Sequence, residues 1–65
     1  MNFWIARDAD NELFIYDEKP IRGERKFICG QRNGRFGEYM EISSELFPEV
    51  TFENSPQEVE IIKKF

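Results

Sequence analysis

The residues best suited to chemistry lie in segment 19–35, where basic side chains stand among glycines. These basic residues are Lys19, Arg22, Arg25, Lys26, Arg32 and Arg35. With Glu24 as the only acidic group, segment 19–35 has a net charge of +5, whereas segments 1–18 and 36–65 have net charges of −4 and −5. This distribution predicts a basic patch on an acidic surface, provided that the loops lie on one side of the molecule.

Three interpretations of the basic segment are open. Its side chains pair with acidic strands of the same chain, in exposed ion pairs of low energy. Alternatively, Arg32 and Arg35 contact phosphates of a nucleic acid while Phe36 or Tyr39 stacks on a base. In the third interpretation, arginine and aromatic side chains anchor an acidic protein partner. A net charge of −4 and a pI near 4.7 oppose general affinity for a polyanion, so a protein partner is favoured over nucleic acid.

The stretch "GQRNGRFG", residues 30–37, has the composition of a tight hairpin loop. Gly30, Gly37 and the pair Asn33-Gly34 are predicted to supply the positive φ angles of that loop. Turning the chain does not require Arg32 or Arg35, so these two arginines are the candidates for a binding role.

Nothing in the sequence indicates catalysis. The chain has no histidine, which leaves the lone Cys29 without a base to activate it. The stretch beginning at Asp8 starts like a calcium loop, but Leu13 occupies the position that requires glycine. We therefore expect no enzyme activity, no metal and no cofactor.

A chain of 65 residues is expected to form one domain, residues 1–65, with a small core. The most secure element is a hairpin in "FWIARDADNELFIY", whose turn is Asp8–Asn11. Both of its faces are apolar. The side chains of Trp4, Phe14 and Tyr16 are therefore predicted to stay at least half exposed, as a surface for a partner or for homo-oligomer formation.

The remaining pattern predicts an all-β fold. Residues 17–25 read as an exposed connection around Pro20, and "KFIC" and "EYMEI" read as a strand pair around residues 30–37. A helical or 3₁₀ turn is expected near Ser44–Phe47, followed by a strand at "VTFE". Residues 55–65 are predicted as a strand, with a C-terminal helix and an α+β class as the alternative.

Five to six short antiparallel strands with one helical turn fit a small antiparallel sheet or a partly closed barrel resembling the SH3-like class. The expected core consists of Phe3, Ile5, Leu13, Ile15, Phe27, Met40, Ile42, Leu46, Phe47, Val50, Phe52, Val59 and Ile61. The sequence shows neither a signal peptide nor an apolar run long enough to span a membrane, so a cytoplasmic location without membrane contact is expected.

The stretches "WIARD", "LFIYDEKPIRGE", "SSELFPEVTFENSP" and "EVEI" resemble a set of small bacterial proteins of prophages and conjugative elements in anaerobic gut bacteria. This set has no assigned activity, so the resemblance transfers no site residue. It implies a small stand-alone accessory protein of a mobile element, of the inhibitor type that acts by binding a protein.

Overall fold

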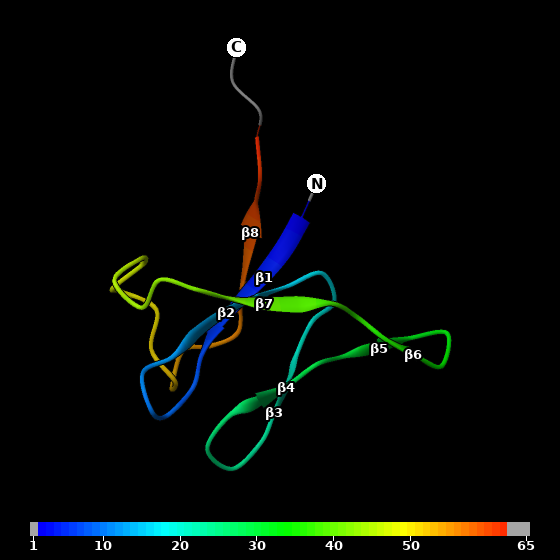
Figure 1. Ribbon diagram of the computed structural model, residues 1–65, viewed down its shortest axis with the longest axis horizontal. Helices are drawn as coiled ribbons and strands as arrows, with labels where there is room; N and C mark the ends of the chain where they lie inside the picture. Colours follow the sequence, from blue (N-terminus) through cyan, green and yellow to red (C-terminus); the bar gives the residue numbers. More distant parts are fainter. Residues whose placement is uncertain (1, 63–65) are drawn as a thin grey trace.

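The computed structural model describes residues 2–62, and every regular element in this part of the chain is a β-strand (Figure 1). The strands are β1 (Asn2–Arg7), β2 (Leu13–Tyr16), β3 (Ile21–Arg22), β4 (Phe27–Ile28), β5 (Gln31–Arg32), β6 (Arg35–Phe36), β7 (Tyr39–Ile42) and β8 (Gln57–Glu60). The predicted all-β class is confirmed. The number of strands is higher than the expected five or six, because two-residue strands pair within segments that the pattern assigned largely to loops.

A four-stranded antiparallel sheet with the order β7-β2-β1-β8 forms the centre of the molecule. β1 and β2 form the predicted first hairpin, in which Ile5 lies opposite Ile15. Asn11 has a φ of 79° in the turn, a conformation that asparagine tolerates well. Because β7 and β8 are both edges, the sheet is open and does not close into the barrel considered above.

Two small hairpins, β3–β4 and β5–β6, project from the sheet in different directions (Figure 1). They correct two predictions. Residues 17–25 contain a strand, since β3 pairs with β4, and residues 27–29 do not pair with 39–42, since β7 pairs with β2. A tight turn connects β3 to β4, in which the N–H of Gly23 donates to the carbonyl oxygen of Lys26 at 2.8 Å.

Glycines in the β5–β6 region act in two ways. Asn33 and Gly34 have φ angles of 53° and 78°, which confirms the predicted asparagine–glycine turn. Gly30 has no positive φ, but a Cβ atom there would overlap the carbonyl oxygen of Lys19. The prediction of positive φ is therefore wrong at Gly30 and also at Gly37, where a Cβ atom would overlap the carboxylate of Asp17. Both glycines are required for close packing against a neighbouring segment.

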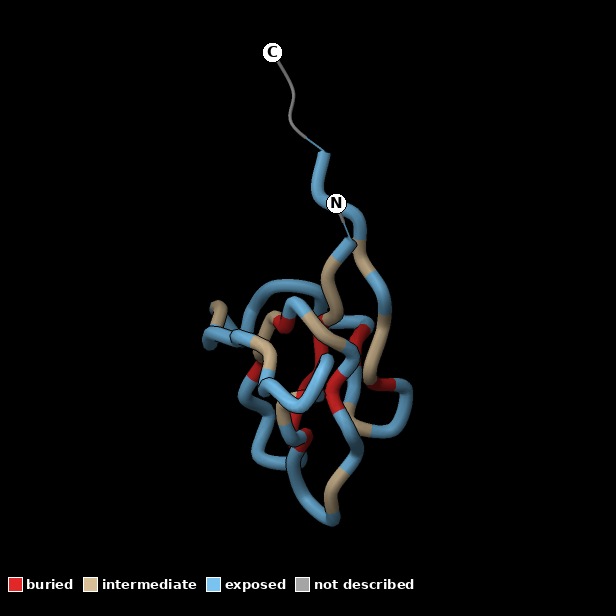
Figure 2. The backbone as a smooth tube through the Cα atoms, turned by 90° about the vertical axis from the view of Figure 1, so that its right-hand side faces the viewer, coloured by how far each residue is buried: buried red, intermediate tan, exposed pale blue. Residues whose placement is uncertain are grey.

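Both faces of the sheet are covered, and each face has its own core. The first core contains the buried Ile5, Leu13 and Val50, with Ile15, Ile42 and Val59 packed against them. The second core contains the buried Ala6, Tyr16 and Phe27, with Trp4, Phe14, Cys29 and Phe52 packed against them. Figure 2 shows the buried segments within the body of the molecule, below the extended ends of β1 and β8.

The side chain of Arg7 organises the connection from β7 to β8. It is buried, and its guanidinium donates to the carbonyl oxygens of Asn11, Ser44, Leu46, Phe47 and Val50. The shortest of these bonds runs from Nε to Val50, at 2.6 Å. A buried charge is costly unless it is fully hydrogen-bonded, and here five backbone carbonyls solvate it. The connection therefore wraps around the guanidinium.

Tight turns replace the helical turn predicted at Ser44–Phe47 and the strand predicted at 50–53. The N–H of Leu46 donates to the carbonyl oxygen of Ser43 at 3.1 Å, and that of Val50 donates to Phe47 at 2.9 Å. These turns direct backbone carbonyls toward Arg7. Leu46 and Phe47, both expected in the core, are consequently exposed.

The C-terminal part of the described chain forms strand β8, as predicted, rather than the alternative helix. Residues 63–65 of the predicted segment 55–65 lie outside the described residues. Two further residues of the expected core, Met40 and Ile61, are exposed. The buried centre of this sheet face is formed by Ile5, Leu13 and Val50 instead.

Candidate functional site

An open cleft lies between the sheet and the two hairpins and has a volume of about 490 Å³. Its aromatic lining residues are Phe14, Tyr16, Phe27, Phe36 and Tyr39. These residues come from four strands, β2, β4, β6 and β7, so the cleft exists only once the sheet and both hairpins have formed. We call it the aromatic cleft.

The register between β2 and β7 builds the sheet wall of the aromatic cleft. Tyr16 lies opposite Tyr39, and their rings stack with centres 5.6 Å apart. The ring of Phe14 meets Tyr39 edge-on at 5.9 Å. Although it makes both contacts, Tyr39 remains 57% exposed, so its outer surface is available to a ligand.

The β3–β4 hairpin forms a firmly attached wall. Its Phe27 is buried, and the N–H of Phe27 donates to Oδ1 of Asp8 at 2.8 Å. A second bond joins the N–H of Ala9 to the carbonyl oxygen of Arg25 at 2.8 Å. Burial raises the pKa of Asp8, and the hydrogen bond from Phe27 opposes this effect. The first turn of the sheet thus holds this hairpin through its backbone.

The wall formed by the β5–β6 hairpin is more exposed. Phe36 is 67% exposed at the end of this hairpin. The N–H of Gly37 donates to the carbonyl oxygen of Gly30 at 2.8 Å and closes the base. Phe36 therefore presents most of its ring to solvent beside the stacked tyrosines.

Cys29 and Tyr16 are groups in the aromatic cleft that can ionise. Burial raises the pKa of the Cys29 thiol, and the nearby Asp17 raises it further. The thiol donates a hydrogen bond to the carbonyl oxygen of Gly37 at 2.8 Å. Burial also raises the pKa of Tyr16. The cleft offers apolar ring surfaces and hydrogen-bond donors rather than an activated nucleophile.

Three of the six predicted basic site residues contact other parts of the chain. The ammonium of Lys19 lies 5.3 Å from the centre of the Trp4 ring. Nε of Arg32 pairs with Oε1 of Glu18 at 2.7 Å. Arg22 is held most firmly, since its guanidinium lies over two phenylalanine rings and donates to the carbonyl oxygens of Phe52, Glu53 and Ser55.

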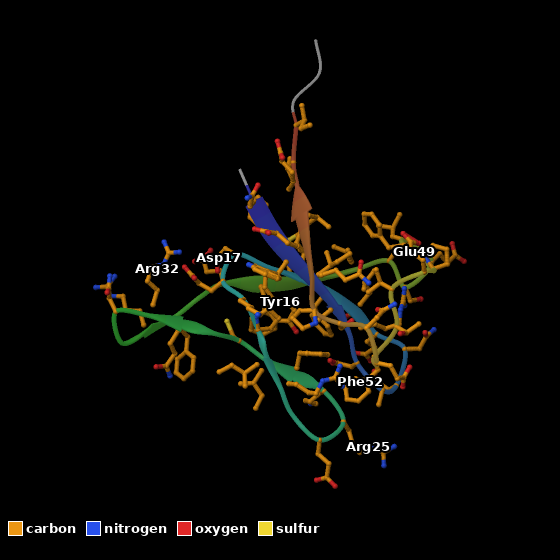
Figure 3. All side chains as sticks on the ribbon, turned by 180° about the vertical axis from the view of Figure 1, so that it is seen from behind. Tyr16, Asp17, Arg25, Arg32, Glu49 and Phe52 are labelled. Carbon is orange, nitrogen blue, oxygen red and sulfur yellow. The ribbon has the colours of Figure 1, made fainter. Side chains whose placement is uncertain are left out.

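The other three basic residues, Arg25, Lys26 and Arg35, are exposed. Arg25 and Lys26 belong to the β3–β4 hairpin, and Arg35 belongs to β6. Figure 3 shows Arg25 and Arg32 on hairpins that point away from each other. The structure therefore distributes five of the basic residues over two projections and places Lys19 in the connection before β3. Of the six, only Lys26 lines the aromatic cleft.

The predicted aromatic site residues are less exposed than expected. Tyr16 is buried, and Trp4 and Phe14 are partly buried. The prediction that they stay at least half exposed is wrong, because the β3–β4 hairpin and Phe52 cover this face. Phe14 and Tyr16 do line the aromatic cleft, whereas Trp4 does not.

The sequence pattern indicated Phe36 and Tyr39 only as stacking partners for a base, and not as other site residues. Period-two alternation in "EYMEI" puts Tyr39 on the sheet face opposite Met40. This alternation is a sequence signal that Tyr39 lies outside the core face assigned to Met40. The assumed pairing of this segment with 27–29 concealed the contact of Tyr39 with Tyr16.

No family model matches this chain, and neither a curated protein nor a solved structure matches it significantly. Within residues 2–62, no three potential metal-ligating side chains lie close enough together to hold an ion. The same part of the chain contains no helix that is long and apolar enough to cross a membrane.

Proposed function

We propose that this chain is a small, non-catalytic protein-binding module whose contact surface is the aromatic cleft. The observation that carries the proposal is the exposure of Phe36 and Tyr39, at 67% and 57%, in a cleft lined by five aromatic side chains. Exposed aromatic clusters of this kind are typical of protein interfaces, where buried rings supply much of the binding energy.

The chemistry of the cleft agrees with binding rather than turnover. Its thiol has a raised pKa and is engaged with Gly37, and its carboxylate, that of Asp8, accepts the N–H of Phe27. Both groups serve to hold the walls in place. An apolar or aromatic side chain of a partner would contact ring surfaces that are already positioned, which limits the entropy lost on binding.

The resemblance to prophage and conjugative-element proteins extends this proposal. In that setting the module is an accessory protein that acts on a protein of its host by occupying a surface, as an inhibitor does. The nucleic-acid alternative has less support, because three of its six basic residues contact groups within the chain.

Affinity capture from a bacterial lysate tests the proposal by comparing two variants at positions of similar exposure. Phe36→Ser removes a ring from the aromatic cleft, whereas Ile21→Ser removes an apolar side chain, 59% exposed, that does not line it. We expect Phe36→Ser to lower the amount of captured partner about tenfold or more, and Ile21→Ser to leave it unchanged. Equal capture by both variants would contradict the proposal.

A further inference from the structure

Strand β7 is an open edge of the sheet, and its register fixes which backbone groups face outward. The N–H of Asp17 donates to the carbonyl oxygen of Glu38, so Glu38 and, two residues on, Met40 direct their backbone groups toward β2. In an antiparallel pair this direction alternates from residue to residue. Tyr39 and Glu41 therefore direct their N–H and C=O groups away from the sheet, where a further strand would bind.

Hollows lie on both faces of this edge. The aromatic cleft lies on the face of Tyr39. A second, apolar groove lies on the face of Met40, which is 63% exposed there, and Phe3 and Ile15 also line it. Side chains of an added strand would point alternately to the two faces, so each hollow would receive every second side chain.

The surroundings of β7 are acidic. Asp17 and Glu38 line the apolar groove. At the other end of the strand, Asp10, Glu12 and Glu41 line one shallow hollow, and the charges of Asp10 and Glu41 raise the pKa of Glu12. The ion pair found among residues 2–62 joins Arg32 to Glu18 and neutralises none of these groups.

This charge determines which occupant the edge favours. A second copy of the chain, joined through the same edge, would bring two sets of carboxylates together and would be opposed by their repulsion. A segment with lysine or arginine side chains would be attracted instead.

We propose that β7 binds an extended segment of a protein partner by strand addition, and that this segment alternates apolar with basic residues. The backbone of Tyr39 and Glu41 would supply the hydrogen bonds. The aromatic cleft on the face of Tyr39 would accept the apolar side chains, and the carboxylates of Asp17 and Glu38 on the face of Met40 would select the basic ones. This inference rests on the proposed function and specifies how the partner binds.

The test uses a short synthetic peptide of alternating valine and lysine, with a valine–glutamate peptide as its matched control. Each is titrated to millimolar concentration into the isotope-labelled full chain, and amide shifts and hydrogen exchange are recorded. We expect the lysine peptide to slow exchange at Tyr39 and Glu41 about tenfold or more, since these amides gain partners, and the glutamate peptide to have no effect. Glu38→Lys, on the face that receives the lysines, should weaken binding of the lysine peptide about two- to fivefold.

Each other outcome overturns the inference. Unchanged exchange at Tyr39 and Glu41 excludes strand addition, and if shifts then appear at Phe36 and Ile28, the proposed use of the aromatic cleft survives. Equal binding of both peptides refutes the charge selection. Protection of Tyr39 and Glu41 without peptide, with a mass in sedimentation that rises with concentration, identifies a second copy as the occupant.

Discussion

The hairpins β3–β4 and β5–β6 have similar sequences but very different attachments. Each is a pair of two-residue strands that includes arginine and phenylalanine. In the first hairpin, Phe27 is buried in the second core; in the second, Phe36 is 67% exposed. The difference shows that basic, glycine-containing loops of the same appearance can be either part of a core or mostly exposed surface.

The arginines follow the same division. The guanidinium carbon of Arg22 lies 5.1 Å from the ring centre of Phe27 and 4.5 Å from that of Phe52. Arg32 makes one ion pair, with Glu18, and its side chain is 73% exposed. Arginine at the first hairpin therefore acts as a structural clamp between β3–β4 and segment 52–55, whereas at the second it remains close to solvent.

The comparison predicts that Phe27→Ala is the most damaging change. It would remove a buried ring and leave a cavity beside Tyr16, at a cost of about 3 to 5 kcal/mol, which is comparable to the whole stability of a domain this small. Urea unfolding followed by Trp4 fluorescence measures the loss. Phe27→Leu, expected to cost about 1 kcal/mol, keeps the test readable if the alanine variant does not fold.

The control for Phe27→Ala is Phe36→Ala. We expect it to change the free energy of unfolding by less than about 0.5 kcal/mol, because the ring of Phe36 contributes little to a core. Similar losses of unfolding free energy in Phe27→Ala and Phe36→Ala would mean that both hairpins belong equally to the folded core.

A smaller but clear effect is expected for Arg22→Lys. Lysine keeps the positive charge but loses the planar group that lies over both rings and reaches three carbonyl oxygens. The expected cost is about 1 to 2 kcal/mol in urea unfolding. An unchanged midpoint would show that charge alone is sufficient, and that Arg22 does not clamp the two segments.

Local signals account for the parts of the fold that the sequence predicted correctly. The Asp8–Asn11 turn lies between two apolar runs, Asn33-Gly34 marks the tip of the second hairpin, and alternation in "EVEI" marks β8. Each signal is carried by a few neighbouring residues, and at these sites the tertiary structure agrees with their backbone preferences.

Choices between distant partners account for the errors. Segments 27–29 and 39–42 both have strand character, but they do not pair with each other. The hydrogen bond from the N–H of Phe27 to Asp8 helps to fix the position of segment 27–29, and no local pattern reveals this bond. Burial of Arg7 is equally hidden, since its hydrogen-bond acceptors are backbone carbonyls of a segment some forty residues away. The aromatic cleft depends on both choices, which explains why its residues were only partly predicted.

The smallest effect is predicted for Arg32→Ala, and this variant tests the exposed side of the comparison. The pair with Glu18 has a short distance, 2.7 Å, but solvent screens it because the arginine side chain is 73% exposed. Exposed pairs contribute about 0 to 1 kcal/mol, so urea unfolding should place the variant in that range, with its midpoint close to that of the wild type. Glu18→Gln should produce the same small change, and the double variant should add little, because both single changes remove the same pair. If Arg32→Ala instead matched the loss of Arg22→Lys, the β5–β6 hairpin would be part of the cooperative core. Phe36 would then be positioned by a rigid support, and the aromatic cleft would have two fixed walls instead of one fixed wall and one exposed wall.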